Sequence, residues 1–552
     1  MGVILNPGAS AFLSARRLNI YVDKSDMISR IIPFVGTADK YLCVSRPRRF
    51  GKSFMANMLS AYFDNTVDGH EAFKGLKVTS EPSFETCLNK FYVVKLNMQN
   101  FISESEDIKE MIELLKRSVM WDLKKVFPDV SYFDENNLGR SFADIYDATG
   151  NTFVFIIDEW DSIFREFKTD FAAQKKYLDF LRDLLKDRDY VEFAYMTGIL
   201  PIKKYGSQSA LNMFKEISME SPGIFAEYTG FTNDEVLKLC ESHNMDMEAC
   251  RLWYDGYSFP NCEHIYNPRS LVEAMNNAAF ADYWNKTETY EALRAYIDMN
   301  FDGLKDSIIK MMAGSRERVN TGSFQNDMTT FSNKDDVLTL LIHLGYLGYD
   351  KEKSEVFIPN KELMMEFVTS TTAGIPWKEV ANSVSESREL LKSTWAMKEK
   401  DVAAGLEKAH LETSHLQYND ENALSYTISL AYYAARDYYS IVREMPAGIG
   451  FADMVFIPRK NSVDKPAMIV ELKWDKSVDT AIKQICNKHY PDVLKKFTGD
   501  ILLVGINYDK KTKKHECRIE RLKKIKRGLT GSFLSGIVRA KERLNDYLIV
   551  KD

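Results

Sequence analysis

The chain has 552 residues, 45% of them hydrophobic and 28% charged, with a formal net charge of −6. These proportions are those of a globular protein with room for more than one domain, and they exclude a disordered chain. No uncharged apolar run reaches the ~18 residues of a membrane span, and the seven cysteines include no CxxC pair. We therefore expect a cytoplasmic protein in a reducing compartment, with no membrane contact and no zinc site.

Short apolar segments alternate with amphipathic ones through residues 1–231. The segments YLCVSR, FYVVKLNM, TFVFIIDEW and VEFAYMTGI predict strands, and KSFMANMLSAYF and EDIKEMIELLKRSVMWDLKKVF predict helices between them. Strands that alternate with helices favour βαβ units and a mainly parallel sheet. Because these strands are apolar throughout, we expect helices to cover both faces of that sheet.

The first of these strands leads into a pattern that is typical of phosphate binding. Three residues carry it, where a helix begins: Gly51, Lys52 and Ser53. In such a loop backbone N–H groups surround the phosphates, the lysine reaches the terminal phosphates and the hydroxyl holds Mg²⁺. The first glycine of the GxxxxGKS/T pattern is replaced by Arg46, which adds positive charge together with Arg48 and Arg49. We expect Arg48 and Arg49 to join the nucleotide site, since positive charge suits a polyanion.

Two acidic residues stand at the end of the strand FVFIID: Asp158 is its last residue and Glu159 follows it. We expect Asp158 to hold Mg²⁺ and Glu159 to polarise the attacking water, because ligands bind at the carboxyl ends of strands in such sheets. The same pair could instead cap the next helix, but the phosphate-binding pattern upstream favours the nucleotide role. Thr197 ends a later strand, where its hydroxyl could sense the terminal phosphate.

Residues 232–400 have a mostly helical pattern, which Thr232 opens as a plausible N-cap. The stretch DDVLTLLIHLGYLGYDKEKSEVFIPNKELMMEFV predicts a helix, a short hairpin and a second helix. That is the order of a winged helix, although a simple helical lid would also fit. Glu362 and Glu366 lie on the second helix among few basic residues, which favours contact with protein over reading of DNA.

Residues 401–552 return to strands, and a hairpin there carries three charged residues: Asp453, Glu471 and Lys473. Glu471 and Lys473 are two apart on one strand, so both project from the same face. A turn centred near residue 462 or 463 places Asp453 opposite roughly residues 471 to 473, so we expect Asp453 and Glu471 to be cross-strand neighbours. Such carboxylates suit a divalent metal for phosphodiester hydrolysis, with the lysine orienting the attacking water. The alternative is an exposed salt bridge on the hairpin.

Several of these motifs resemble those of the AAA-ATPase-like family of bacterial and archaeal proteins, whose members often end in a PD-(D/E)XK nuclease-like domain. The resemblance rests on SRPRRFGKS, IIDEWD, the upstream YVDKSDMI and the stretch YDGYSF…YNPRSLV, and it covers nearly the whole chain. It implies an additional-strand P-loop core whose ATP and Mg²⁺ residues are Lys52, Ser53, Asp158 and Glu159. The YDGYSF stretch has no chemical role that follows from its residues, and its aromatic side chains fit core packing equally well.

The C-terminal motif resembles the active-site core of the PD-(D/E)XK superfamily, a restriction-endonuclease-like α/β fold. Asp453, Glu471 and Lys473 match its D…ExK signature. The resemblance further implies Glu421 as an acidic metal ligand on the first helix, and Gln484 with Tyr490 as a polar pair on the helix after the ExK strand.

Together these patterns predict an ATP-hydrolysing protein that cuts nucleic acid, with ATP and Mg²⁺ as cofactors. The expected domains are a P-loop ATPase at 1–231, a helical and winged-helix-like region at 232–400 and a nuclease-like domain at 401–552. Nucleic acid, DNA in preference to RNA, is the expected partner, and a homo-oligomer is compatible with the chain. Two alternatives remain: a regulatory NTPase switch whose nuclease-like domain binds nucleic acid or protein without cutting, and a toxin-like or defence effector whose cutting is controlled by ATP.

The C-terminal segment has a charge opposite to that of the rest. Residues 501–552 contain 14 Lys or Arg against 6 Asp or Glu. A basic run there would guide a nucleic-acid backbone, unless it is an ordinary solvated helix face. Its members are Lys523, Lys524, Lys526 and Arg527.

Overall fold

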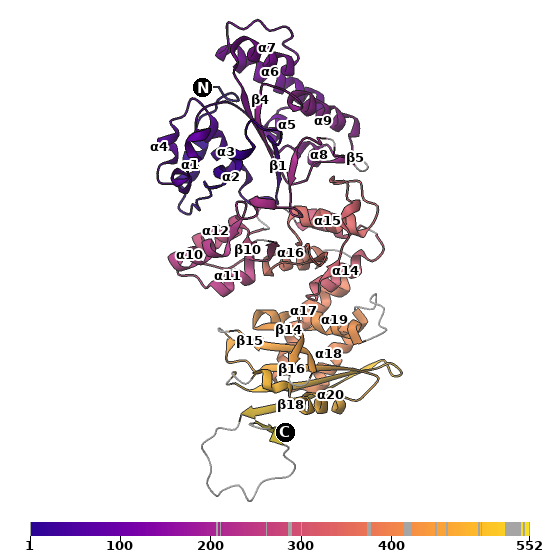
Figure 1. The fold of residues 1–552 in the computed structure, drawn as a ribbon. Coiled ribbons are helices and arrows are strands. Elements are labelled where there is room, and N and C mark those ends of the chain that lie inside the picture. Colours follow the sequence, from indigo (N-terminus) through magenta and orange to yellow (C-terminus); the bar gives the residue numbers. More distant parts are fainter. Residues whose placement is uncertain are drawn as a thin grey trace, which may run out of the picture. The chain divides into compact units, whose positions relative to one another are not determined.

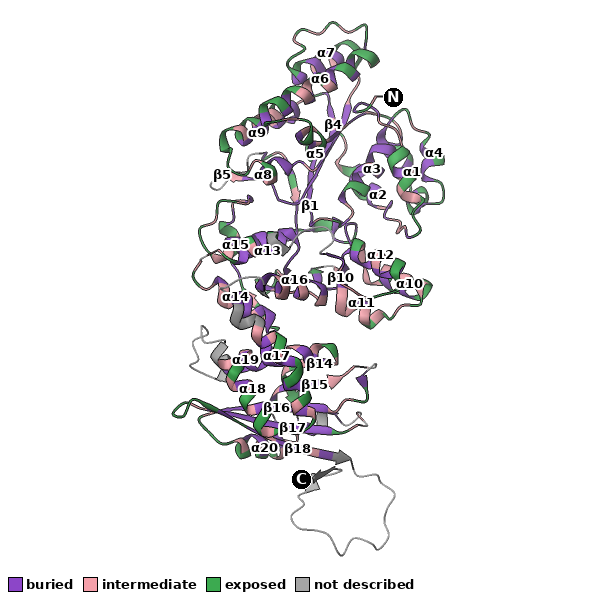
Figure 2. Cartoon of the chain, turned by 180° about the vertical axis from the view of Figure 1, so that it is seen from behind, coloured by how far each residue is buried: buried purple, intermediate pink, exposed green. Residues whose placement is uncertain are grey.

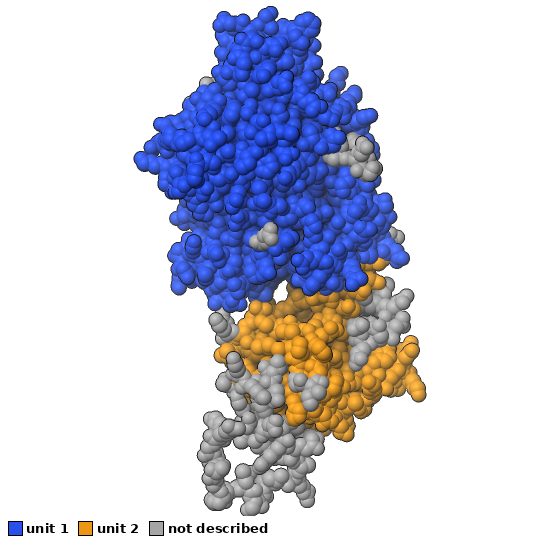
Figure 3. Space-filling view, in the orientation of Figure 1, with its two compact units in different colours: residues 1–289, 300–302, 316–365 blue, residues 290–299, 303–315, 366–552 orange. Residues whose placement is uncertain are grey.

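The computed structural model describes residues 2–205, 208–209, 211–260, 262–284, 290–299, 301–372, 377–412, 421–447, 450–459, 462–494, 497, 499–524, 543–544 and 547–550. The chain divides into two units, which Figure 3 distinguishes by colour. Unit 1 comprises residues 1–289, 300–302 and 316–365, and unit 2 comprises residues 290–299, 303–315 and 366–552. The three domain ranges expected from the sequence stay a prediction. No helix in the described part of the chain is both long and apolar enough to cross a membrane.

A five-stranded parallel sheet forms the centre of unit 1 (Figure 1), with the strand order β2-β3-β4-β1-β7. The strands are β1 (Tyr41–Ser45), β2 (Tyr92–Asn97), β3 (Phe153–Asp158), β4 (Val191–Gly198) and β7 (Lys215–Ile217). Strand β4 lies between β1, which leads into the phosphate loop, and β3, which ends at Asp158. This inserted strand is the additional strand of the predicted core, and the P-loop type of α/β fold is confirmed.

Helices cover both faces of this sheet, as the apolar strands predicted. Alternate residues of β3 enter two separate hydrophobic clusters: Phe155 and Ile157 pack on one face, and Val154 and Ile156 on the other. The first face is covered by α6 (Ile108–Val126), α7 (Leu138–Thr149) and α9 (Phe171–Leu185), and the second by α3 (Lys52–Phe63). Figure 2 shows β1 and β4 of this sheet as largely buried. The carboxyl ends of β1, β3 and β4 are therefore held rigidly at one edge.

A small helical subdomain follows the sheet in unit 1. It contains β8 (Phe231–Thr232), α10 (Asn233–His243), α11 (Met247–Tyr254), β9 (Tyr257–Phe259), β10 (Cys262–Tyr266) and α12 (Pro268–Asn277). The predicted cap of α10 is confirmed as a capping box, in which Thr232 and Glu235 exchange side-chain and backbone hydrogen bonds. The three short strands form one antiparallel sheet in the order β8-β10-β9.

The predicted order of helix, hairpin and helix is present as α15 (Lys334–Leu344), β12 (Gly348–Asp350), β13 (Glu355–Phe357) and α16 (Lys361–Thr372). The short β11 (Glu317–Arg318) adds a third strand beside β13. Glu362 and Glu366 are buried, so their charge does not form an exposed surface, and the preference for protein contact over reading of DNA stays a prediction. Glu362 instead accepts hydrogen bonds from the backbone N–H groups of Tyr283 and Trp284, at 2.8 and 3.0 Å.

Unit 2 contains a mixed seven-stranded sheet in the order β14-β15-β16-β17-β18-β20-β19. The strands are β14 (Tyr439–Ala447), β15 (Gly450–Pro458), β16 (Ala467–Trp474), β17 (Ile501–Asp509), β18 (Lys514–Lys524), β19 (Arg543–Leu544) and β20 (Tyr547–Val550). Only β16 and β17 pair in parallel, and α20 (Val478–Asn487) connects them. Helix α20 packs on one face, and α17 (Lys378–Trp395), α18 (Glu399–Glu412) and α19 (Glu421–Ala431) pack on the other. The predicted C-terminal α/β domain is confirmed.

Candidate functional site

The loop between β1 and α3 is bent into a conformation that suits phosphate binding. Arg49 and Gly51 both adopt positive φ angles, 67° and 90°. The Lys52 ammonium is buried and donates to the carbonyl oxygens of Arg46 and Pro47, at 3.0 and 2.9 Å. Burial lowers the pKa of Lys52. The negative charges of Glu159, Asp161 and Asp158 act in the opposite direction and raise it, but by less. An anion that entered the loop would therefore meet a desolvated cation at the start of a helix.

Arg46, which replaces the first glycine of the phosphate-binding pattern, does not face the loop. Its side chain is fully buried and donates to Thr229 Oγ1 at 2.8 Å, to the Ser45 carbonyl at 2.9 Å and to the Ile217 carbonyl at 3.3 Å. Its guanidinium lies 5.3 Å from the centroid of the Phe259 ring. Arg46 therefore ties the phosphate loop to β7 and to the helical subdomain.

The acidic residues lie at the carboxyl end of β3, beside the end of β4. The Thr197 hydroxyl donates to Asp158 Oδ1, and both side chains are buried. Glu159 has a positive φ of 56°, an uncommon conformation for a glutamate. Its carboxylate forms an ion pair with Arg165 of α8 (Ser162–Glu166). The structure therefore brings Asp158, Glu159 and Thr197 together, and Thr197 contacts Asp158 where the sequence had suggested a contact with phosphate.

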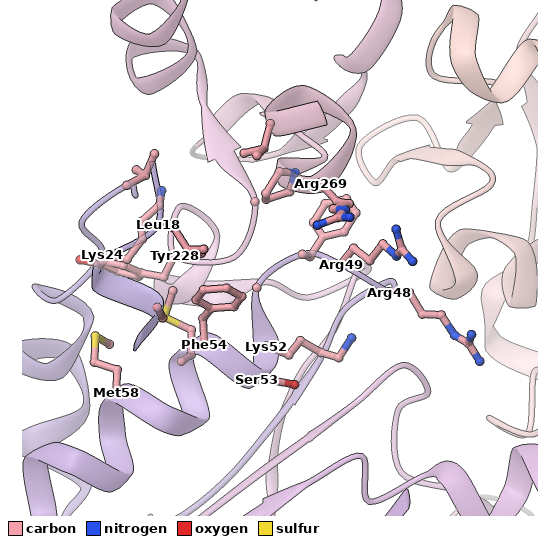
Figure 4. A pocket seen from close by; sticks show the side chains of 18 of the residues that line it. Leu18, Lys24, Arg48, Arg49, Lys52, Ser53, Phe54, Met58, Tyr228 and Arg269 are labelled. Atoms are coloured by element: carbon pink, nitrogen blue, oxygen red, sulfur yellow. The ribbon is translucent and has the colours of Figure 1, made fainter. Parts of the chain in front are cut away.

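A pocket of about 1000 Å³ opens beside this loop. Figure 4 shows Lys52 and Ser53 within it, the arginines Arg48, Arg49 and Arg269 toward one side, and Leu18, Phe54, Met58 and Tyr228 toward the other. Glu159 and Arg165 also line the pocket. Its apolar part is formed largely by these residues: Phe12, Leu18, Ile20, Val22, Phe54, Met58, Phe231 and Val272. The arginines and Lys52 gather on one side of the pocket, and the other side is largely apolar although Lys24 lies there, an arrangement that fits a triphosphate joined to a flat base.

Three cationic residues that line the pocket were not predicted from the sequence: Lys24, Arg165 and Arg269. Lys24 is buried and pairs with Glu235 of α10 at 2.6 Å. Arg269 lies in the first turn of α12 after the Asn267 cap, and pairs with Glu273 at 2.6 Å. Lys24 and Arg269 belong to the motifs YVDKSDMI and YNPRSLV, so a signal was present. An arginine in the first turn also opposes the helix dipole, and such a local conflict often marks a functional position.

The YDGYSF stretch acts on the phosphate loop through packing. The Tyr257 ring meets the Phe50 ring edge-on, with centroids 5.2 Å apart, and its hydroxyl donates to the Gly345 carbonyl at the end of α15. A Cβ atom on Gly345 would lie 2.6 Å from Pro47 Cβ. Tyr257 therefore packs against the phosphate loop, in agreement with the interpretation that the aromatic side chains of this stretch serve in packing.

In unit 2 the hairpin places the predicted charged residues side by side. The pairs Met454–Val470 and Val455–Ile469 set the register of β15 and β16, and Asp453 and Glu471 follow one step beyond. Asp453 Oδ2 accepts the Leu472 N–H at 2.6 Å. Lys473 Nζ lies 2.8 Å from Glu471 Oε1, and both side chains are buried. The alternative of an exposed salt bridge is wrong for this pair.

Gln484 on the following helix also reaches this site, and Tyr490, which lies beyond the end of that helix, contacts Gln484. Gln484 of α20 donates to Glu471 Oε1, and its amide lies 3.3 Å from the Tyr490 hydroxyl. Glu421 begins α19, but its side chain lies outside the described residues. Among the residues that the structure describes, no three His, Cys, Asp or Glu side chains converge closely enough to hold a metal. Asp453 and Glu471 still supply the hard oxygen donors that Mg²⁺ prefers.

Two family models match the chain. Residues 8–207 match the predicted AAA-ATPase model, and residues 421–517 match the PD-(D/E)XK nuclease superfamily model. The two matched ranges contain the phosphate loop with its acidic residues and the Asp453–Lys473 hairpin, respectively. The resemblance inferred from the sequence motifs is confirmed.

One curated relative is an uncharacterized protein in the vnfD 5′ region of Azotobacter chroococcum mcd 1, with 27% identity over 280 residues. The match covers 49% of this chain and 51% of that protein, so the chain spans about half the length of the relative. Among solved structures, the Aeropyrum pernix ORC2 protein in its ADPNP–ADP complexes aligns with 64% of this chain and 94% of its own. The identity is 12% and the TM-score 0.22, a similarity too low to support an argument.

Proposed function

We propose that this chain, which carries an AAA-ATPase-like domain over residues 8–207 and a PD-(D/E)XK nuclease superfamily domain over residues 421–517, hydrolyses ATP and cuts nucleic acid. The pocket beside Lys52 and Ser53 carries the first half of this proposal, because it joins a cationic loop to an apolar chamber. The contacts among Asp453, Glu471, Lys473 and Gln484 carry the second half.

In the nucleotide site, Lys52, Arg48 and Arg49 would bind the phosphates, and the apolar chamber would hold the base. Ser53 and Asp158 would hold Mg²⁺, which screens the phosphate charge when bound. Thr197 would fix the orientation of Asp158 through the hydrogen bond that the two side chains share. Glu159 would orient the attacking water and accept its proton, the role that hydrolysis requires of a residue at this position.

In the nuclease site, Asp453 and Glu471 would hold a divalent ion, joined by Glu421 or by water. A bound divalent ion lowers the pKa of a coordinated water and stabilises charge that develops on the phosphodiester. Lys473 would place its ammonium beside the nucleophile and favour the deprotonated form. Gln484 would fix the Glu471 carboxylate, to which it donates. DNA is favoured over RNA as the substrate, and the basic run from Lys523 to Arg527, whose side chains lie outside the described residues, would contact its backbone.

ATP binding and hydrolysis test the first half. We expect Lys52→Ala to weaken ATP binding, and Glu159→Gln to retain binding while slowing hydrolysis. Titration calorimetry and phosphate release on the full chain measure the two effects. If Lys52→Ala binds and hydrolyses ATP as the parent does, the nucleotide site is misplaced.

Incubation with labelled single- and double-stranded DNA and RNA tests the second half, in Mg²⁺ or Mn²⁺, with and without ATP. We expect Asp453→Ala and Glu471→Ala to abolish cutting and to leave ATP hydrolysis intact, because the two sites lie in separate units. Cutting that persists in EDTA, or in both variants, would contradict the mechanism. A parent protein that binds but never cuts would favour the alternative of a regulatory switch.

A further inference from the structure

Glu159, the residue proposed to orient water, is held by a neighbour on its own chain. Arg165 Nη2 donates to Glu159 Oε2, and both residues line the pocket beside Lys52. Only 8% of the Arg165 side chain is exposed. A carboxylate held in this way is not free to turn toward an attacking water.

The other side of the Arg165 guanidinium faces a fixed carboxylate. Arg165 Nε lies 3.7 Å from Asp161 Oδ2. That oxygen also accepts the backbone N–H groups of Ile199 and Leu200, at 3.0 and 2.9 Å, directly beyond the end of β4. Asp161 is fully buried and anchored by backbone hydrogen bonds. Glu159 lies at the pocket wall, so it is the partner that Arg165 can exchange.

Arginine presents a planar fork of donors that fits carboxylates and phosphates equally well. A triphosphate bound at Lys52 would bring a second anion close to the guanidinium, and the stronger local charge of the terminal phosphate would compete with Glu159. A nucleoside diphosphate lacks that group and would leave the ion pair in place. The ion pair between Arg165 and Glu159 would therefore respond to a triphosphate and not to a diphosphate, because only the triphosphate carries the terminal phosphate that hydrolysis removes.

We propose that Arg165 is a positioning residue that holds Glu159 when no nucleoside triphosphate is bound and exchanges it for the terminal phosphate when one binds. The inference rests on the proposed ATPase function. Once released, Glu159 accepts a proton from water as the water oxygen bonds to the γ-phosphorus. The bond from that phosphorus to the β,γ-bridging oxygen breaks, and its electron pair leaves with ADP. The proton then passes to solvent, so the products are ADP and inorganic phosphate.

The test compares the binding of AMPPNP, a triphosphate analogue that resists hydrolysis, with that of ADP to the full chain. We expect Arg165→Met to weaken AMPPNP binding about tenfold and to leave ADP binding nearly unchanged, because one charge-assisted contact is lost. Arg165→Lys should recover part of the preference for the triphosphate. Glu159→Gln should strengthen AMPPNP binding several-fold when Arg165 is present, and should have little effect in Arg165→Met.

Arg182→Met is the control, because Arg182 also pairs with a nearby acid of the chain, Asp179 on α9, but does not line the pocket. It should leave both affinities unchanged. If Arg165→Met weakens AMPPNP and ADP equally, or if Glu159→Gln acts identically with and without Arg165, the exchange does not occur and only this inference fails. A parent protein that binds neither nucleotide would overturn the proposed ATPase function together with the inference.

Discussion

Arg46 shows how a single residue can change the way a phosphate loop is supported. Glycine at this position ordinarily lets the loop bend through its own backbone. Arg46 instead uses three hydrogen bonds and a cation–π contact to fix the loop from behind. Burial lowers the pKa of Arg46 only to about 10, so the guanidinium remains charged at neutral pH. The departure from the glycine pattern is therefore a structural substitution rather than a loss of the site.

We expect Arg46→Gly, which restores the glycine of the common pattern, to destabilise the protein. The change removes donors from buried acceptors and leaves a cavity, at a cost of about 3 kcal/mol or more in the free energy of unfolding. Arg46→Lys keeps the charge but not the fork of donors, and should lose less. Urea denaturation measures both. An Arg46→Gly protein as stable as the parent would show that the buried contacts carry no net stabilisation.

At the residue scale the sequence predicted which side chains gather at the site but not how they pair. Because Asp158, Glu159 and Thr197 stand at the carboxyl ends of predicted parallel strands, the sequence predicted that they lie at one edge of the sheet. The structure brings them together there. The ion pair between Glu159 and Arg165 depends on the turn after β3, where Glu159 has a positive φ. No sequence pattern specifies that conformation for a glutamate, so Arg165 could not be assigned in advance.

At the scale of elements, the end of α15 rests against the phosphate loop. Gly345 caps α15 with a φ of 89°, and a Cβ there would lie 2.6 Å from Pro47 Cβ and 3.1 Å from Trp284. We expect Gly345→Ala to displace the loop, and so to weaken ATP binding as well as lower the stability. Titration calorimetry and urea denaturation report the two effects separately.

Gly150→Ala is the matched control for that substitution. Gly150 caps α7 in the same left-handed conformation, with a φ of 71°, but no atom lies within 4 Å of the added Cβ. It should lose about 1 kcal/mol of stability from backbone strain alone and keep the ATP affinity of the parent. Equal ATP affinities in the two variants would mean that α15 does not position the loop.

Helices and strands could be predicted from the sequence because each depends on the spacing of apolar residues within a short segment. Apolar strands between amphipathic helices predicted a mainly parallel first sheet, and the spacing of Glu471 and Lys473 predicted a common face for their side chains. The support that β9 and α15 give to the loop joins residues far apart in the chain, such as Tyr257, Phe50 and Gly345. Such contacts arise from packing, which a periodic pattern does not specify.

At the scale of the whole molecule, the two units contain buried groups with opposite responses to acid. In unit 2, His410 and His515 pack together, with ring centroids 5.1 Å apart. Burial lowers the pKa of His410 to about 4 and that of His515 to about 3. In unit 1, burial raises the pKa of Glu362 to about 8, against hydrogen bonds from Tyr283, Ser270 and Trp284 that favour the charged form.

These shifts set the sign of the pH dependence in each unit. Between about pH 4 and 6.5 the unfolded histidines bind protons that the folded ones do not, so unit 2 loses stability as the pH falls. Glu362 behaves in the opposite way: the folded state keeps a proton up to about pH 8 that the unfolded state releases near pH 4.5. Its contribution is therefore fully present below about pH 4.5, declines as the pH rises from there, and is lost above about pH 8.

We therefore expect acidification from pH 7 to pH 5 to destabilise unit 2 by about 2 kcal/mol from His515, with less from the partly exposed His410. Hydrogen exchange of β17 and β18 amides, corrected for the intrinsic pH dependence of exchange, measures this loss, and α15 amides in unit 1 serve as the comparison. His515→Phe keeps an aromatic ring without a titrating group and should flatten the response of β17 and β18. Glu362→Gln should leave that response unchanged and instead remove the gain of unit 1 in acid. If β17 and β18 are equally protected at pH 7 and pH 5 in the parent, the histidines are not held neutral by the fold.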